Sequence, residues 1–224
     1  LRCTGHRVWT RAPIRRGASE AAWLRFAAEA VPGSAPRVLA VDEKSFAMAL
    51  EYFDADSYRD WKSELMAGRV NLEDSAAIGR TLGKIQAEST RDPELAAHFA
   101  NDDLFESLRI EPYLRRSAAA LPAVRDNINS VIAELESTHI GLVHGDFSPK
   151  NILVGVSTAP AEPVILDAEC AMWGDPVFDA AFCLSHLTLK GIHFPTKATD
   201  YRAAAQAFEH AYLGEVTWED PGLA

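Results

Sequence analysis

The stretch "HGDFSPKN" places an aspartate and an asparagine five positions apart, and a second aspartate ends the later apolar run "PVILD". A loop carboxylate such as Asp146 can accept a proton from an attacking hydroxyl that lies within hydrogen-bond reach. Asn151 and Asp167 offer a neutral and a charged oxygen, the hard ligands that Mg²⁺ takes together with phosphate oxygens and water. One base with two metal ligands is a minimal set for phosphoryl transfer, which depends on positioning and charge neutralisation. These three residues are therefore candidates for that chemistry.

Short apolar runs surround these residues and must position them. "IGLVH", "NILVG" and "PVILD" are separated by polar turns, and each predicts a short strand. The segment "VFDAAFCLSHLTL" after "WGDP" predicts a helix. We therefore expect the candidate residues on loops between short strands, with a helix behind them.

The N-terminal third predicts a small α+β unit. A helix is expected to begin with Ser19 as its N-cap and to end at Pro32 and Gly33. "RVLAV" and "FAMALEYF" then predict two strands of a hairpin, and the second alternates with Phe46, Met48, Leu50 and Tyr52 on one face. The polar segment "DADSYRD" predicts a lobe boundary.

Helices are predicted for most of the chain beyond that boundary. One amphipathic helix contains Ile78, Leu82 and Ile85 at helical spacing. A second begins just after Pro122, and its expected apolar face consists of Val124, Ile128, Val131, Ile132 and Leu135.

The motifs as a whole resemble a known superfamily. His-x-Asp, an asparagine five residues after the aspartate, and a strand that ends in aspartate resemble the catalytic and metal motifs of protein-kinase-like enzymes. Glycine after the histidine, and the later "DAECAMWGDPVFDAAF", are similar to the aminoglycoside phosphotransferase and choline kinase branch. The resemblance implies a protein-kinase-like α+β fold with two lobes. Residues 1–56 would be an incomplete N-terminal lobe, and residues 57–224 a mostly helical C-terminal lobe.

The resemblance also assigns roles in the catalytic half. Asp146 corresponds to the catalytic base, and Asn151 and Asp167 correspond to the Mg²⁺ ligands. His144 would brace the catalytic loop. Asp179 would fasten that loop by accepting hydrogen bonds from backbone N–H groups.

The nucleotide half is represented less completely. The backbone near Glu51 and Phe53 would pair with adenine, and Leu153 would lie under the purine ring. Glu20 corresponds to a helix glutamate that pairs with a nucleotide-binding lysine. The 19 residues before Glu20 contain neither that lysine nor a glycine-rich loop, so we expect a fragment or an abbreviated member of the family.

Two functions follow from the resemblance. The first is an ATP- and Mg²⁺-dependent phosphotransferase that acts on a hydroxyl of a small molecule, such as an aminoglycoside, an amino alcohol or a sugar-like acceptor. The second is a catalytically impaired relative that binds a nucleotide or a partner without turnover. Two further residues have open readings: Lys150 either reaches a phosphate or stays solvated, and Trp173 either lines the acceptor site or packs in the core.

Composition excludes several other classes. The 224 residues carry a formal net charge of −10, which argues against a nucleic-acid binder. No apolar run is long enough to span a membrane, and three scattered cysteines indicate neither a disulfide framework nor a zinc site. No transition-metal site is indicated either, because the spacing of His139, His144, His186 and His193 does not match one. We expect a cytoplasmic protein, and the sequence does not indicate its oligomeric state.

Overall fold

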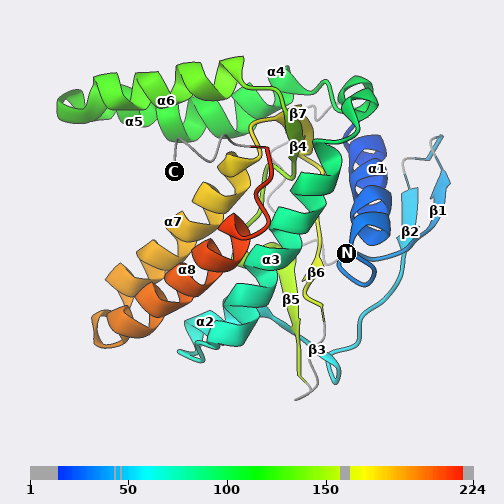
Figure 1. Cartoon of the computed structure of the whole chain (residues 1–224), viewed down its shortest axis with the longest axis horizontal. Coiled ribbons are helices and arrows are strands. Elements are labelled where there is room, and N and C mark those ends of the chain that lie inside the picture. The colour runs from blue at the N-terminus through cyan, green and yellow to red at the C-terminus, as the bar shows by residue number, and fades with distance from the viewer. Residues whose placement is uncertain (1–14, 43, 46, 157–161, 219–224) are drawn as a thin grey trace.

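Figure 1 shows the computed structural model, which describes residues 15–42, 44–45, 47–156 and 162–218. A small N-terminal part with one helix and one hairpin lies against a larger, mostly helical part, as the α+β prediction requires. Phe46, one of the four residues predicted to alternate along the second strand, lies outside the described residues.

The N-terminal helix is longer than the sequence predicts. α1 (Arg15–Ala30) ends shortly before Gly33, whose φ of 92° is a left-handed conformation that glycine adopts without strain. The predicted end is therefore confirmed, but the predicted start is wrong. Ser19 is a buried residue inside the helix, where its hydroxyl accepts a hydrogen bond from Asn101 at 2.9 Å instead of capping the helix.

A two-stranded hairpin follows the helix. β1 (Val38–Asp42) pairs antiparallel with β2 (Ala47–Leu50). Met48 and Leu50 are partly buried against the core while Ala47 and Ala49 are exposed, so the predicted alternation is confirmed for these positions. The strand ends earlier than predicted, and the side chain of Tyr52 is 84% exposed.

Four helices form the body of the larger part. α3 contacts both α1 and α8, and α8 packs in turn on α7. Ile78, Leu82 and Ile85 of α3 are buried, as their spacing predicts. A methyl group on Gly79 would lie 2.2 Å from the carbonyl oxygen of Phe208, so any side chain there would force α3 and α8 apart. The bounds of these helices are α2 (Trp61–Met66), α3 (Leu72–Ser89), α7 (Val177–His193) and α8 (Ala198–Leu213).

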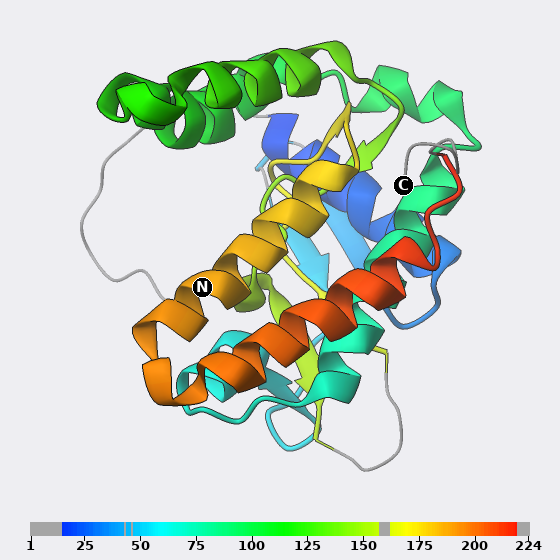
Figure 2. The ribbon, with the colours of Figure 1, turned by 60° about the vertical axis from the view of Figure 1, so that its left-hand side comes forward.

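A layer of further helices covers one end of the larger part (top in Figures 1 and 2). Pro112, which has no N–H to donate, lies in a π-helical stretch that continues α4 into α5. The predicted apolar face of α6 is only partly buried: Ile132 is in the core, whereas Val131 is 47% exposed. The bounds are α4 (Asp102–Phe105), the π-helix (Glu106–Arg115), α5 (Arg116–Ala120) and α6 (Arg125–Ser137).

Two small antiparallel sheets hold the loops between these layers. In one, β5 (Ile152–Gly155) lies between β3 (Tyr58–Asp60) and β6 (Val164–Ile165). In the other, β4 (Gly141–Val143) pairs with β7 (Met172–Gly174). The three strands predicted around the motifs are confirmed as β4, β5 and β6. β3 lies in the polar segment "DADSYRD" and β7 in the motif segment "DAECAMWGDPVFDAAF", so both fall outside the three apolar runs that predict strands.

One hydrophobic core connects the two parts. Trp23 and Leu24 of α1 are buried together with side chains of α2, α3, α7 and α8. The division of the chain at residue 56 stays a prediction. None of the described helices combines the length and the apolar character that crossing a membrane requires.

Candidate active site

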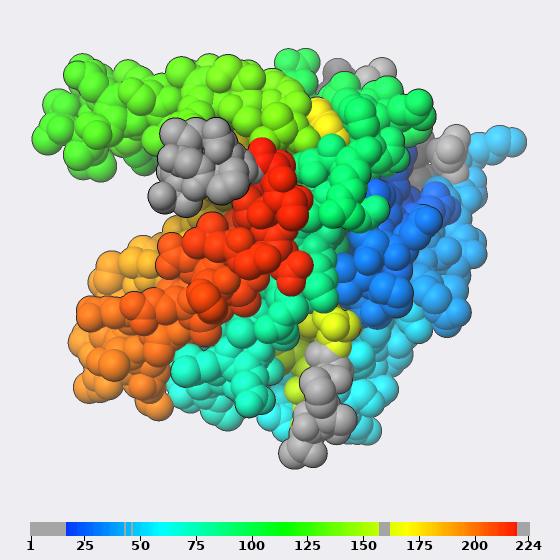
Figure 3. Space-filling view, in the orientation of Figure 1, coloured from blue at the N-terminus to red at the C-terminus, as the bar shows by residue number. Residues whose placement is uncertain are grey.

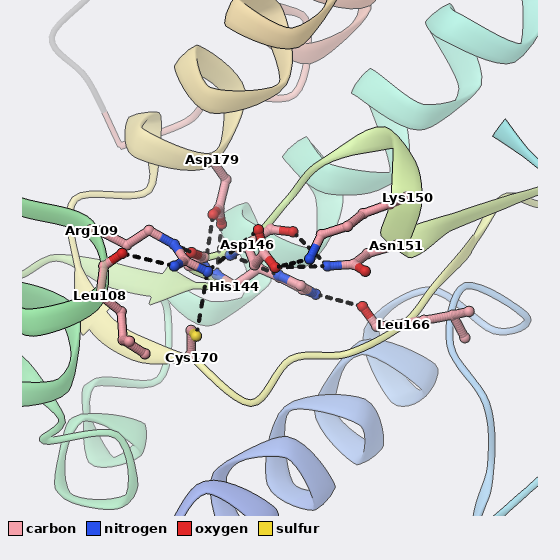
Figure 4. A network of polar contacts seen from close by, with 10 residues as sticks. Leu108, Arg109, His144, Asp146, Lys150, Asn151, Leu166, Cys170 and Asp179 are labelled. Carbon is pink, nitrogen blue, oxygen red and sulfur yellow. Dashed lines mark hydrogen bonds and ion pairs between the residues drawn. The ribbon is translucent and has the colours of Figure 1, made fainter. Parts of the chain in front are cut away.

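The loop predicted to be catalytic runs from β4 to β5 and includes one turn of 3-10 helix (Pro149–Asn151) (Figure 4). Gly145 has a φ of 77°, a conformation that side chains disfavour. A Cβ atom at this position would also lie 2.5 Å from the carbonyl oxygen of Cys170. Backbone conformation and lack of space therefore both require the glycine of "HGD".

His144 connects the two motifs from a fully buried position. Its Nδ1 accepts the backbone N–H of Asp146 at 3.2 Å, and its Nε2 lies 3.1 Å from the carbonyl oxygen of Leu166. Because an N–H only donates and a carbonyl only accepts, the ring is neutral with its proton on Nε2. Burial lowers the pKa of His144 to about 4, which agrees with this state. The ring also packs edge-on against Trp23, with centroids 4.8 Å apart, so α1 supports the loop directly.

Asp179 holds the same loop from α7. Its carboxylate accepts the backbone N–H groups of His144 at 2.6 Å and Gly145 at 2.9 Å, and the side-chain amide of Gln86 at 3.1 Å. The backbone hydrogen bonds predicted for Asp179 are therefore confirmed. Burial raises the pKa of Asp179 to about 7, although the three hydrogen bonds act in the opposite direction.

Asp146 lies between two cations. Arg109 Nη2 is 3.3 Å from Oδ1, and Lys150 Nζ is 2.8 Å from Oδ2. The side-chain amide of Asn151 donates to the backbone oxygen of Asp146 at 2.9 Å and to Oδ2 at 3.2 Å. These contacts fix the carboxylate while leaving its side chain 14% exposed, so a small hydroxyl group can still approach it.

A backbone hydrogen bond holds the segment before Asp167 against this loop. The N–H of Leu166 donates to the carbonyl oxygen of Asn151 at 2.8 Å, which places Asp167 one residue away from that contact. Asp167 itself has a φ of 64°, and it is the only non-glycine residue with a positive φ in the described parts of the chain. Aspartate tolerates this conformation better than most residues, and backbone strain of this kind often marks a functional position.

Carboxylates gather around Asp167. Burial and, to a lesser extent, the charges of Asp167 and Glu169 together raise the pKa of Glu20 on α1 to about 7. Burial also raises the pKa of Asp167. A cation bound among these groups would relieve both the desolvation and the repulsion.

These oxygens suit a metal that is shared with a ligand. Within the described ranges, no three or more His, Cys, Asp or Glu side chains are arranged to hold a metal by themselves. Mg²⁺ does not require such a cage, because it usually takes one or two carboxylates together with phosphate oxygens and water. The amide nitrogen of Asn151 is directed at Asp146, so the amide oxygen remains as its ligand atom. The donor set therefore fits Mg²⁺.

Of the residues predicted for adenine, Glu51 and Phe53 lie just after the hairpin, and Leu153 lies in β5. The N–H of Glu51 donates to the carbonyl oxygen of Arg37 at 2.9 Å, and its carboxylate pairs with the same arginine. Phe53 packs edge-on against Tyr58, with centroids 4.9 Å apart. Leu153 is partly buried in β5. Among the described residues, the hydrogen bonds, ion pair and ring contact of Glu51 and Phe53 do not reach the catalytic loop, so their role stays a prediction.

Two residues with open readings are now placed. Trp173 is 8% exposed and belongs to the core, where its Nε1 donates to the carbonyl oxygen of His139, so the core reading is confirmed. Lys150 is not simply solvated, because it pairs with Asp146 while its side chain stays 51% exposed. Burial by itself would lower the pKa of Lys150, but the hydrogen bond and charge of Asp146 raise it above its usual value.

Arg109 is the functional candidate that the sequence did not reveal. In addition to Asp146, its guanidinium contacts the carbonyl oxygens of Gly145 and Leu108 and the sulfur of Cys170. Arg109 lies in the π-helix, 37 residues before the aspartate it contacts, and no motif surrounds it. Only the fold brings the two together.

Comparisons with known proteins agree with this arrangement. Residues 4–220 match the APH family, described as the phosphotransferase enzyme family. A solved structure of amicoumacin kinase hAmiN in complex with AMP-PNP, Ca²⁺ and Ami is similar, with a TM-score of 0.59 and 14% sequence identity. The match covers 96% of this chain and 66% of that kinase, so this chain spans just under two thirds of its length. Among curated proteins, no significant match to the sequence was found.

The structural similarity confirms a protein-kinase-like fold, in which the described N-terminal part contributes only one helix and one hairpin. The family match extends over nearly all of the sequence, including both motifs around Asp146 and Asp167. The chain therefore belongs to the phosphotransferase enzyme family.

Proposed function

We propose that this protein transfers the γ-phosphate of ATP to a hydroxyl group of a small molecule, with Mg²⁺ as the metal. The observation that carries the proposal is the joint position of Asp146, Asn151 and the segment ending in Asp167, connected by hydrogen bonds of 3.2 Å and 2.8 Å. Family membership supports a phosphotransferase, and the similar kinase structure, which contains AMP-PNP and Ca²⁺, supports a nucleotide and a divalent cation.

Asp146 acts as the base in this mechanism. The acceptor hydroxyl donates its proton to the carboxylate while its oxygen forms the new bond to the γ-phosphorus and the bond to the β,γ-bridging oxygen breaks. Arg109 contacts Oδ1 at 3.3 Å from a largely buried position, and Lys150 contacts Oδ2 at 2.8 Å, so the carboxylate is held in one orientation. His144 keeps the loop in register without exchanging a proton itself, because its ring is buried and neutral.

A metal ion and a lysine would both neutralise negative charge on the phosphates. Asn151 and Asp167 would hold Mg²⁺, which neutralises phosphate charge when it is bound. Lys150 has a half-exposed side chain on the same loop, and it can exchange its contact with Asp146 for a phosphate oxygen. Glu51, Phe53 and Leu153 would form the adenine side. Glu20 lies near Asp167 and would orient the nucleotide-binding cations.

One observation favours the second function, binding without turnover. The causes that raise the pKa of Glu20 among the described residues are burial and the charges of Asp167 and Glu169, and no cation is among them. A chain in which Glu20 has no cationic partner could bind a nucleotide weakly and fail to align its phosphates. Measuring binding and turnover separately distinguishes the two functions.

Thermal unfolding with ATP and Mg²⁺ tests the binding step. At a ligand concentration of about 100 times Kd, binding stabilises the folded state by about 2.7 kcal/mol. We expect this stabilisation in the natural chain and its loss in Asp167→Asn, a substitution chosen because asparagine tolerates the φ of 64° at this position. Asp200→Asn, at an exposed aspartate on α8, is the control and should keep the full shift. Equal shifts in all three proteins would contradict the metal role of Asp167.

Release of ADP in the presence of hydroxylated acceptors tests turnover. Acceptor-dependent ADP release that is lost in Asp146→Asn supports the phosphotransferase. A nucleotide-dependent thermal shift without ADP release, for every acceptor class tried, would instead establish the binding module.

A further inference from the structure

An apolar pocket of about 390 Å³ lies between the π-helix, α6 and α7. Its apolar lining includes Tyr113 and Leu114 from the π-helix, Val131 and Leu135 from α6, and Phe178 and Phe182 from α7. In the space-filling view the surface is hollowed between the green helices that contain α6 and the orange helices that contain α7 (Figure 3).

The walls of the pocket are apolar surface that the core does not use. Tyr113 is 56% exposed, and Val131 is also largely exposed although the α6 sequence pattern places it on the apolar face. Phe178 and Phe182 stack with their centroids 5.7 Å apart, and Tyr113 packs edge-on against Phe182 at 6.2 Å. Exposed aromatic and aliphatic side chains that gather in a concave site are typical of a small-molecule pocket.

Arg109 connects this pocket to the catalytic loop. Its guanidinium lines the pocket and lies 5.9 Å from the ring centroid of Phe182, while its Nη2 is 3.3 Å from Oδ1 of Asp146. A single guanidinium group therefore separates the apolar wall from the proposed base. Asp146 does not itself line the pocket, but it lies in direct contact with a residue that does.

We infer that the pocket holds the body of the phosphate acceptor, and that the acceptor is an alcohol with an aromatic or alicyclic apolar body. This inference rests on the proposed function and narrows its acceptor class. A polyhydroxylated sugar would lose hydrogen bonds with water in a pocket with this lining and regain few of them. Carboxylates are present as well, since Glu134 and Asp175 also line the pocket, so an amine on the acceptor is compatible with it.

The test compares two alcohols and two classes of variant. 3-Phenylpropan-1-ol represents the apolar class, and methyl β-riboside represents the sugar class. Ala181→Glu introduces a charge from α7, and Val131→Asp introduces one from α6; both positions are exposed and line the pocket. Thr188→Glu adds the same charge as Ala181→Glu at an exposed position of α7 outside the pocket, and it is the matched control.

Two measurements are made on each protein. Ligand-observed NMR without nucleotide reports binding of each alcohol, and ADP release with ATP and Mg²⁺ reports KM and kcat. We expect 3-phenylpropan-1-ol to bind and react better than the riboside. Both pocket variants should raise the KM for 3-phenylpropan-1-ol by about tenfold or more, because the bound alcohol would remove water from the introduced carboxylate. Thr188→Glu should leave this KM unchanged.

The outcomes separate this inference from the proposed function. If the riboside reacts and the apolar alcohol neither binds nor reacts, the acceptor class is wrong and the phosphotransferase stands. If the pocket variants change KM no more than Thr188→Glu does, the pocket is not the acceptor site. If the alcohol binds in the pocket and no acceptor of any class supports ADP release, the proposed function fails, and the acceptor role of the pocket fails with it.

Discussion

The catalytic loop and the β1–β2 hairpin are held in opposite ways. The loop rests on Asp179 and His144, both fully buried, whose hydrogen bonds join α7, the loop and the segment before Asp167. The hairpin has mostly exposed strands. Among the described residues, the side-chain ion pair next to these strands joins Glu51 to Arg37, whose side chain is 73% exposed.

This difference separates what the protein fixes in advance from what it leaves adjustable. Buried polar groups that are fully hydrogen-bonded define one geometry, so the proposed base stands in position before any substrate binds. A hairpin with mostly exposed strands, which contacts the core only through partly buried side chains such as Met48 and Leu50, can reorient at smaller energetic cost. We infer that chemistry is preorganised on the loop side and that nucleotide contacts form on binding at the hairpin side.

The largest effect is expected at the proposed base. Asp146→Asn removes the proton acceptor and should lower kcat by a factor of about 10² to 10⁴. Asparagine has nearly the same shape as aspartate, so circular dichroism should show an intact fold. ADP release with a responsive acceptor measures the rate. A variant that retains more than half of the natural rate would show that Asp146 is not the base.

Loss of the Arg109 guanidinium should be the next largest effect. Arg109→Met keeps the length of the side chain and leaves Asp146, only 14% exposed, without its Arg109 partner. Removing one partner of a buried pair typically costs about 3 to 5 kcal/mol, and Lys150 on Oδ2 places the expected value at the lower end. Urea unfolding measures this loss, and kcat should fall with it.

An exposed pair provides the comparison for Arg109. Arg91 and Glu88 lie 2.8 Å apart on the surface with side chains 64% and 52% exposed. Arg91→Met should leave the urea midpoint nearly unchanged, because water and salt screen such pairs. If Arg109→Met is equally mild, the loop is not held by buried charges, and the contrast with the hairpin disappears.

A pH-dependent effect follows from His144. Its pKa is about 4 in the folded chain against an ordinary value of 6.5, so the unfolded chain binds a proton first as the pH falls. The stability from this group is present above about pH 6.5 and is lost as the pH falls toward 4. The difference in unfolding free energy between the natural chain and His144→Gln should therefore shrink by about 3 kcal/mol over this window.

Asp179 gives the opposite sign and serves as the internal check. Its folded pKa of about 7 lies above its ordinary value of 3.8, so its contribution is present below about pH 4 and is lost as the pH rises toward 7. In the natural chain the pH-dependent contributions of His144 and Asp179 to the unfolding free energy therefore offset each other over much of the range from pH 4 to 7. Urea unfolding at a series of pH values should thus give slopes of opposite sign for the differences measured with His144→Gln and Asp179→Asn. Parallel slopes would contradict the buried network.

The loop could be predicted from sequence because its information is local. The spacing of Asp146, Asn151 and Asp167 and the short apolar runs around them lie within 30 residues, and each run became a strand. Even the hydrogen bonds of Asp179 followed from the family motif. The glycine of "HGD" was recognised by resemblance, and the structure now gives its physical reason.

Features that depend on tertiary contacts could not be predicted. Nothing near Arg109 in the sequence marks it, because its partners come from two segments later in the chain, the loop at Gly145 and Asp146 and the segment at Cys170. The α6 pattern predicted a buried face, yet Val131 lines a pocket, since periodicity identifies an apolar side without saying what covers it. A serine before an apolar run predicts an N-cap, but the same pattern also occurs inside a helix, where the structure places Ser19.

The smallest effect is expected at the hairpin. Arg37→Ala removes the pair with Glu51, and because that pair is exposed the midpoint of thermal unfolding should change by no more than about 2 °C. Hydrogen exchange should nevertheless become faster for the amides of β2 and stay unchanged for those of the loop at His144 and Gly145, which are bonded to Asp179. Added ATP and Mg²⁺ should restore protection in β2 if nucleotide contacts form there on binding. If ATP and Mg²⁺ leave the exchange rates of the β2 amides unchanged, the nucleotide does not bind against the hairpin.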